Sequence, residues 1–346
     1  MFVILIRSSG VHEWFTRTRA RTGCSLFSSI SFLDFHFISA FVTVNPLPLA
    51  LSQETMVSVL KIVSFNTYLI SKRYNNNHET FSGVRALKIR EVLEGNDLCF
   101  FQEVWGAGLP ELLRDVTAHV TPPLRTPWLV FGNGLLAETI NTAYLHIMKT
   151  GGLYDFSTPS MICRYRKKHT FTKSRSKSRK GVEATLWDVP QWGEGKKLLV
   201  FNTHLDPWSV SNRRHQVGEI LEFFRDTLQT IDERSNGTHD WSNTGVIALG
   251  DFNIKADSAE YEETLMSNQG WIDYFQDELG QTYATDNSLA NYPEDCGRID
   301  YIFGVERYGT SHRFLPLKAV SRSIRKEPVG EESSDHYALL LDLLPA

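Results

Sequence analysis

Polar residues that can bind a metal ion or transfer a proton recur at the ends of short apolar runs in this sequence. Ligand sites in α/β folds gather where strand ends meet at one edge of a sheet. Taken singly, such a residue is more often a turn or cap residue, but six coincidences in one region favour a common site. The residues are Asn66, Glu103, His204 with Asp206, Asp251 with Asn253, Asp300, and Asp335 with His336.

These residue types are suited to the hydrolysis of a phosphoester. That reaction requires neutralised phosphoryl oxygens, an activated in-line water and a stabilised leaving group. Mg²⁺ prefers oxygen ligands and is usually held by one or two carboxylates, which makes Glu103 the best candidate ligand, with Asn66 beside it. A neutral imidazole can accept a proton from water near neutral pH, so His336 is the candidate general base.

The segments that carry these residues alternate between strand and helix patterns. Apolar, β-branched runs predict strands at 59–65, 97–101, 198–205, 246–249, 299–303 and 337–341. Helical spacing predicts one helix that Ser82 caps and Gly95 ends, and a second through Val217 and Leu228. With 42% apolar residues in a chain of 346, a large core can be buried. The alternation predicts sheets covered by helices in a single α/β domain.

Residues 1–55 differ from the rest of the chain. Basic residues precede an apolar, Ser/Phe-rich stretch that polar residues and prolines interrupt. We interpret 1–55 as a leader that is a signal peptide, an anchor, or not part of a mature protein starting at Met56. The folded domain is predicted over 56–346. The protein is expected to be membrane-associated or secreted if the leader is real, and cytoplasmic otherwise.

The charge and the cysteines exclude several classes of protein. A net charge of −4 argues against a globally basic nucleic-acid-binding surface, and four scattered cysteines with no CxxC do not form a disulfide scaffold or a structural zinc motif. Nine of the 36 basic residues lie between Phe156 and Val182, so the rest of the chain carries 27 basic and 40 acidic residues. The stretch 164–180 has no apolar period and is predicted to contain a mobile loop, solvated or facing an anionic partner.

In order along the chain, these motifs resemble the endonuclease/exonuclease/phosphatase superfamily. The resemblance rests on Asn66, Gln102-Glu103, 202–205, Gly250-Asp251-Phe252-Asn253, 298–302 and Ser334-Asp335-His336, and it spans roughly residues 59–343. It implies a four-layer α/β sandwich, in which two packed mixed β-sheets are flanked by helices. It also implies that 56–346 is a catalytic domain with a Mg²⁺-dependent phosphodiesterase or phosphatase site, for which Mn²⁺ is an alternative cation.

The resemblance assigns roles to individual residues. It places Glu103 on the metal, with Asp335 at a second or shared cation position, and Asp300 as the carboxylate that orients His336. His204 is then expected to donate to a phosphoryl oxygen or to the leaving group. Asp251 and Asn253 are expected to position the water and the phosphate.

Within the superfamily, several features are similar to neutral sphingomyelinases. These are Glu103-Val104-Trp105, the run 212–216 after the histidine motif, and Lys180-Gly181-Val182. They imply hydrolysis of sphingomyelin to ceramide and phosphocholine at a membrane surface, with Trp105 and Lys180 as substrate-binding residues. Aromatic faces that could hold a choline group are Trp105, Tyr144, Tyr154 and Trp208. The alternative is a Mg²⁺-dependent endonuclease or exonuclease acting on nucleic acid, or another phosphatase of the superfamily; no protein partner is inferred.

Overall fold

The computed structural model describes residues 57–69, 82–104, 112, 119–121, 152–174, 180–268 and 270–346. Contacts divide the chain into Met1–Gln53 and Glu54–Ala346, and the described residues all belong to the second unit. The leader predicted over 1–55 lies outside the described residues and stays a prediction. Among the described residues, no helix is both long enough and apolar enough to cross a membrane.

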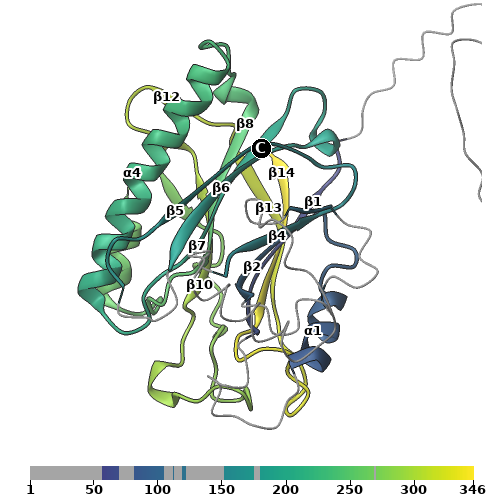
Figure 1. The fold of residues 1–346 in the computed structure, drawn as a ribbon, viewed down its shortest axis with the longest axis vertical. Coiled ribbons are helices and arrows are strands. Elements are labelled where there is room, and N and C mark those ends of the chain that lie inside the picture. Colours follow the sequence, from purple (N-terminus) through teal and green to yellow (C-terminus); the bar gives the residue numbers. More distant parts are fainter. Residues whose placement is uncertain are drawn as a thin grey trace, which may run out of the picture. The chain divides into compact units, whose positions relative to one another are not determined.

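Two six-stranded mixed sheets form the centre of the described structure (Figure 1). The first has the order β13-β14-β1-β2-β4-β3, with bounds Leu317–Arg325, Ala338–Pro345, Leu60–Leu69, Leu98–Val104, Tyr154–Ser157 and His119–Thr121. The second has the order β5-β6-β7-β8-β10-β9, with bounds Ile162–Thr170, Gly181–Asp188, Lys197–His204, Thr244–Asp251, Asp300–Val305 and Trp271–Asp273. A hairpin joins β11 (Arg307–Tyr308) and β12 (His312–Arg313).

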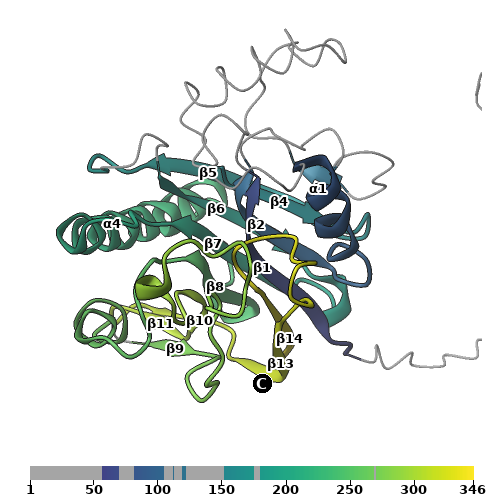
Figure 2. The ribbon, with the colours of Figure 1, turned by 90° about the horizontal axis from the view of Figure 1, so that it is seen from below.

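The sheets pack face to face, with helix α1 (Ser82–Glu91) beside the first sheet and α4 (Val210–Arg234) along the second (Figure 2). Both faces of the central strands are therefore buried. On β7, Leu198 and Val200 belong to the cluster between the sheets, whereas Leu199 and Phe201 belong to the cluster under α4. This alternation produces three apolar clusters between four layers, in agreement with the predicted sandwich.

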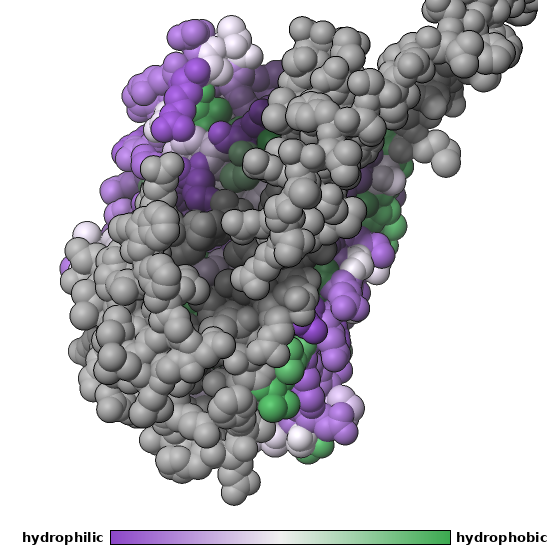
Figure 3. All heavy atoms as spheres, turned by 45° about the vertical axis from the view of Figure 1, so that its right-hand side comes forward, coloured by the Kyte–Doolittle hydropathy of each residue, from purple (hydrophilic) through white to green (hydrophobic). Residues whose placement is uncertain are grey.

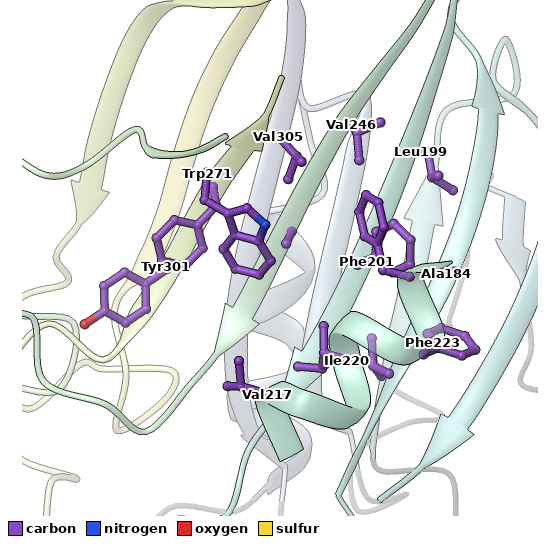
Figure 4. Close-up of a cluster of buried hydrophobic side chains, with 14 of the residues drawn as sticks. Ala184, Leu199, Phe201, Val217, Ile220, Phe223, Val246, Trp271, Tyr301 and Val305 are labelled. Atoms are coloured by element: carbon purple, nitrogen blue, oxygen red, sulfur yellow. The ribbon is translucent and has the colours of Figure 1, made fainter. Parts of the chain in front are cut away.

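The cluster under α4 fixes the helix that follows the histidine motif. Val217, Ile220 and Phe223 face Phe201 and other side chains of the second sheet (Figure 4). Phe224 stacks on Phe201 with ring centroids 4.6 Å apart. The Ser209 side chain accepts a hydrogen bond from the Asn212 amide and caps the helix N-terminus. Close packing of these rings fixes the direction in which the preceding β7 strand ends.

The predicted strands all exist, but several extend further than the apolar runs that indicated them. β1 and β2 include Asn66 and Glu103, which the apolar pattern placed just after the strands. The reason is that the backbone ladder between β1 and β2 continues to the pair Leu69↔Val104, past Phe65 and Phe101, where the predicted apolar runs end. Eight of the fourteen strands in the described part of the chain were not predicted, because they are short or carry many polar residues. They are β3, β4, β5, β6, β9, β11, β12 and β13.

The basic stretch 164–180 begins in a strand that the sequence did not predict. The loop predicted within it stays a prediction, because 175–179 lie outside the described residues. Residues up to Thr170 belong to β5, which pairs with β6 over its whole length at the edge of the second sheet. Arg166 forms ion pairs with Asp155 and Glu183, and Arg164 pairs with Asp188 at 2.6 Å. Charged side chains on an edge strand commonly protect it against pairing with the edge of another sheet. Ion pairs with acidic neighbours, and not an apolar period, stabilise this strand.

Candidate active site

The predicted chemical residues converge because the strands that carry them end at one edge. β1 runs parallel to β2, and β7 parallel to β8, so their carboxyl ends lie together within each sheet. β10 begins there and runs antiparallel to β8, which pairs Asp300 with Asp251. β1 and β2 also contact β7, β8 and β10 across the sandwich. A cleft of about 450 Å³ opens at this edge, within the usual size range of a ligand site.

Backbone irregularities at the strand ends direct side chains into the cleft. The pairing of β1 with β2 shifts register between Asn66 and Leu69, and Tyr68 in that bulge has φ +47°. Glu103 and Asn253 also adopt the left-handed region, with φ of +57° and +52°. Residues other than glycine seldom adopt this region, and where they do they are often found at functional sites. The left-handed backbone conformation at Glu103 and Asn253 thus turns their side chains away from the alternating directions of a regular strand.

Gly250 makes the close approach of β7 and β8 possible. Its φ is +130°, and a Cβ placed there would lie 2.0 Å from the Thr203 carbonyl oxygen. A larger residue would push β8 away from β7 at the point where His204 pairs with Asp251. The glycine of the Gly250–Asn253 motif is therefore a packing requirement of the site.

His336 is held by a buried carboxylate, as the sequence predicted for Asp300. The Nδ1 atom of His336 lies 2.8 Å from Asp300 Oδ2, and both side chains are buried. The ring of Tyr283 packs edge-on against the imidazole, with centroids 5.3 Å apart. The second nitrogen, Nε2, faces the cleft side, 3.4 Å from Asn66 Nδ2 and 3.9 Å from Asp251 Oδ2. The geometry fixes the tautomer that donates from Nδ1 to Asp300.

Asp251 lies at the centre of the group. Its Oδ2 accepts a hydrogen bond from Asn66 Nδ2 at 2.9 Å and lies 3.2 Å from His204 Nε2. Its Oδ1 accepts from the backbone N–H of Asn253 at 2.9 Å. The Asn66 Oδ1 atom accepts from the Tyr68 amide, which fixes the orientation of the Asn66 side chain. Asp251 thus connects the two histidines through one carboxylate.

Lys180 enters the site from the start of β6 and contacts His204. Its Nζ lies 3.0 Å from His204 Nδ1, is close to His204 Nε2 as well, and lies 3.4 Å from Glu103 Oε1. Only 2% of the Lys180 side chain is exposed. Because an ammonium group only donates, its contact with His204 requires an unprotonated nitrogen on the imidazole ring.

The burial of these groups separates their protonation states. Burial, with Lys180 and His336 nearby, lowers the pKa of His204 well below its usual value, so this ring is neutral. Burial opposes the charge of His336, but Asp300, Asp335 and Asp251 outweigh it and raise its pKa to about 10. Burial and Asp300 raise the pKa of Asp251 to about 7. In the protein without a bound cation, His336 therefore carries the proton near neutral pH, and Asp251 titrates near it.

The donor set of the cleft fits a divalent cation. Burial and Glu103 raise the pKa of Asp335 to about 7, against the lowering effect of His336. Asp300 Oδ1 is buried and has no hydrogen-bond partner among the described residues. Asp251, Asp300 and His336 place ligand atoms within 4.8 Å of one another and could hold a metal ion. Because His336 and Asp300 already bond to each other, we favour the oxygen donors Glu103 and Asp335, which line the same cleft.

The structure brings nine of the ten predicted site residues into one region. Eight line the cleft or bond to a residue that does, and Lys180 joins them through His204. Trp105 lies outside the described residues, as does Tyr144. Asp206 does not face the cleft, because its carboxylate accepts from the amides of Trp208 and Ser209 at the start of α4. Tyr154 is buried in β4, which excludes it from a headgroup pocket.

Arg85 is a site-supporting residue that the sequence analysis missed. This arginine of α1 is 2% exposed and donates to the carbonyls of Tyr68 at 2.8 Å and Ser333 at 3.0 Å. It thereby joins the irregular end of β1 to the loop that carries Asp335. The signal in the sequence was an arginine four positions before Ile89, on the apolar face of the predicted helix.

Replacing Arg85 by Met is expected to destabilise the fold by about 2–4 kcal/mol, because two buried carbonyls lose their donor. The free energy of unfolding, measured in urea, checks this. Arg90→Met on the same helix is the matched control, since Arg90 is only half-buried. Equal stability of the two variants would show that Arg85 does not hold the β1 end and the Asp335 loop together.

The sequence and the fold both match known proteins. Residues 63–336 match the sequence pattern of the Endonuclease/Exonuclease/phosphatase family. The sequence matches no individual curated protein.

Among solved structures, an endonuclease/exonuclease/phosphatase from Bacteroides vulgatus is 18% identical with a TM-score of 0.56, covering 84% of this chain and 100% of that chain. D. rerio TDP2 complexed with single strand DNA product is 18% identical with a TM-score of 0.53, covering 83% of this chain and 99% of that chain. The human Nocturnin catalytic domain with bound sulfate anion is 17% identical with a TM-score of 0.52, covering 82% of this chain and 94% of that chain. At these identities the likeness concerns the fold.

Proposed function

Because this chain belongs to the endonuclease/exonuclease/phosphatase family, we propose that it is a metal-dependent phosphodiesterase of the nuclease type, acting on single-stranded nucleic acid. Enzymes of this family are phosphoester hydrolases that usually depend on a divalent metal. The single observation that carries the proposal is the convergence of Glu103, Asp251, His204 and the His336–Asp300 pair on one cleft.

In the proposed reaction the hydrogen-bonded pair of His336 and Asp300 activates a water molecule. Asp300 holds His336 so that Nε2 faces the cleft, within 3.9 Å of Asp251. The three carboxylates that raise the pKa of His336 must first be offset for the imidazole to accept a proton. A divalent cation held by Glu103 and Asp335 would supply that positive charge and would neutralise the phosphoryl oxygens. Asp251 accepts a hydrogen bond from Asn66, which fixes the Asn66 side chain, and its Oδ2 lies 3.2 Å from His204 Nε2.

Lys180 and His204 suit the stabilisation of negative charge on the phosphate. The Lys180 ammonium is buried against the neutral imidazole, which shields it from water. Charge–charge attraction is stronger in such a water-poor environment than at the surface. We propose that Lys180 and His204 together face a phosphoryl or leaving-group oxygen, which extends the substrate-binding role predicted for Lys180.

The substrate class is supported by the family and by the walls of the cleft. The D. rerio TDP2 structure contains a single strand DNA product. In this chain, Trp208 and Tyr292 line the outer part of the cleft, where unstacked bases could pack. On the side shown in Figure 3, the described surface is mainly hydrophilic, and its hydrophobic residues form small groups. The aromatic lining of the cleft is the feature that favours a single-stranded nucleic acid over a lipid surface.

Sphingomyelin remains a second candidate substrate for one reason. Lys180-Gly181-Val182, which is similar to the neutral sphingomyelinases, places Lys180 in the site beside His204. The sphingomyelinase interpretation also used Trp105, which lies outside the described residues. The sequence analysis predicted a lipid substrate at a membrane surface, and we keep that prediction only for sphingomyelin, the second candidate.

A substrate panel with added Mg²⁺ or Mn²⁺ tests the proposal. We expect the purified protein to cleave a single-stranded oligodeoxynucleotide and a simple activated phosphodiester. It should release phosphocholine from sphingomyelin vesicles at least about tenfold more slowly, because contacts of a few groups in a pocket can change the relative rates on two substrates by that factor. Chelation should abolish all three activities. Phosphocholine release as the fastest reaction would replace the nucleic-acid substrate by the lipid. Hydrolysis that persists in chelator would contradict the metal requirement itself.

A further inference from the structure

Two exposed aromatic side chains contact each other at the outer part of the cleft. Trp208 is 57% exposed and Tyr292 is 45% exposed, and they are the only aromatic members of the set of large exposed hydrophobic residues in the described part of the chain. Their ring centroids are 5.8 Å apart and their planes are perpendicular. Both rings line the cleft that contains His336 and Asp251. Exposing aromatic rings to water is unfavourable. Two exposed rings that contact each other in a cleft therefore indicate a surface that a ligand covers.

The Trp208 ring is mounted on a rigid turn next to the chemical centre. Asp206, which is fully buried, accepts hydrogen bonds from the Trp208 amide at 2.9 Å, the Ser209 amide at 3.2 Å and the Asn212 side chain at 3.1 Å. Arg213 donates to the carbonyls of Asp206 and Pro207, which closes the turn from the other side. The turn directly follows His204 and Leu205, so the position of the indole is coupled to that of the catalytic strand.

Tyr292 is held in place by Tyr283, the residue that packs against His336. The Tyr283 hydroxyl accepts hydrogen bonds from the Tyr292 amide at 3.1 Å and the Asn291 amide at 2.9 Å. The Tyr283 ring in turn packs on the imidazole of His336. The two exposed rings are thus each held in place at the site, one through Asp206 and one through Tyr283.

We infer that Trp208 and Tyr292 form a stacking site for a nucleobase of the strand that is cleaved. This inference rests on the proposed function, since it names what lies beside the scissile phosphate. In a perpendicular pair the edge of one ring meets a face of the other, and the faces that stay exposed can each accept a flat group. Stacking is tolerant of base identity because every base has a π face. The site selects strands whose bases are free to leave the stack, and it therefore favours single strands over duplex.

The surroundings of the pair favour a base over a membrane. Lys255, Asn291 and Asp295 line the same cleft, so the two rings share it with polar and charged groups. An interfacial membrane contact instead needs a continuous apolar face with basic residues around it. Val210, two residues from Trp208, is the one further exposed apolar side chain of this segment, at the start of α4.

The test compares two strands that differ only in their bases. One is an octamer of deoxythymidine, and the other has the same sugar–phosphate backbone with hydrogen in place of every base. We expect wild-type kcat/KM to be higher for the octamer, and Trp208→Ala and Tyr292→Ala each to reduce that preference about tenfold, the effect expected for losing one base–aromatic stack. Cleavage of the baseless strand should change little. Trp208→Phe should keep most of the preference, and Val210→Ala should keep all of it.

Binding measured without catalysis separates this inference from the proposed function. Fluorescence anisotropy of a labelled octamer should report about tenfold weaker binding to Trp208→Ala, even if the wild type cleaves neither strand. Absence of cleavage by the wild type with Mg²⁺ and Mn²⁺ would end the proposed function alone. An unchanged preference and affinity in both alanine variants would overturn the stacking site. Equal loss of sphingomyelin-vesicle binding in Trp208→Ala and Val210→Ala, with octamer affinity retained, would assign the pair to a membrane instead.

Discussion

Replacing His336 by Gln is expected to lower kcat on any cleaved phosphodiester by about 10²–10⁴-fold, the usual cost of losing a general base. Gln keeps a polar side chain in the space beside Tyr283 but cannot accept the proton of the attacking water. Asp300→Asn should have a smaller effect, because it removes the orienting carboxylate and leaves the imidazole in place. Steady-state kinetics with saturating Mg²⁺ measure both variants.

His312 provides the matched control for that experiment. It is also a histidine beside a carboxylate, with Nε2 3.6 Å from Asp232 Oδ2, but it does not line the cleft. His312→Gln should therefore retain wild-type turnover. If His336→Gln kept near-normal kcat while its fold was intact by circular dichroism, the assignment of His336 as the base would be wrong.

Replacing Asp335 by Asn is expected to abolish metal-dependent activity and to stabilise the metal-free protein. Asp335 is buried near Glu103 and Asp251, and these charges repel it when no cation is present. Asn has the same shape without the charge, so the free energy of unfolding in chelator at pH 8 should rise by about 1–4 kcal/mol, as a pKa raised by about three units implies. Mg²⁺ should raise the melting temperature of the wild type and not that of the variant.

The pH dependence gives this prediction a definite sign. The pKa of Asp335 is about 7 in the folded protein and 3.8 when unperturbed. Between these values the folded state binds more protons than the unfolded state, so the contribution of Asp335 to stability is full below pH 3.8 and is lost as the pH rises through 7. The gain from Asp335→Asn should therefore be large at pH 8 and vanish by about pH 4.

Asp342→Asn on β14 is the control, because Asp342 does not line the cleft. It should change neither the Mg²⁺ response nor the pH dependence of unfolding. If Asp335→Asn were equally stabilising at pH 4 and pH 8, charge repulsion at the metal position would not be the cause. Glu103→Gln, measured in the same way, should also lose the Mg²⁺ response, since Glu103 is another of the predicted ligands.

Much of the fold could be predicted from local sequence patterns. Apolar runs located the buried central strands, since a strand covered on both faces, such as β7, must be apolar almost throughout. The strand at 162–170 was not predicted for the complementary reason, because β5 is an edge strand whose charged side chains pair with Asp155, Glu183 and Asp188. Such pairing links residues 11–24 positions apart, and no local period reveals it.

By itself, the sequence determined the identity and the order of the chemical residues, from Asn66 to His336, because each follows or precedes a strand that its own apolar neighbours encode. Only the tertiary structure decided their partners and their charge. The contacts of Asn66 with Asp251, of Lys180 with His204, and of Arg85 with the Ser333 carbonyl join residues 185, 24 and 248 positions apart. The packing of the two sheets also buries Asp251, Asp335 and His336 together, and the loss of water there sets which of them holds the proton.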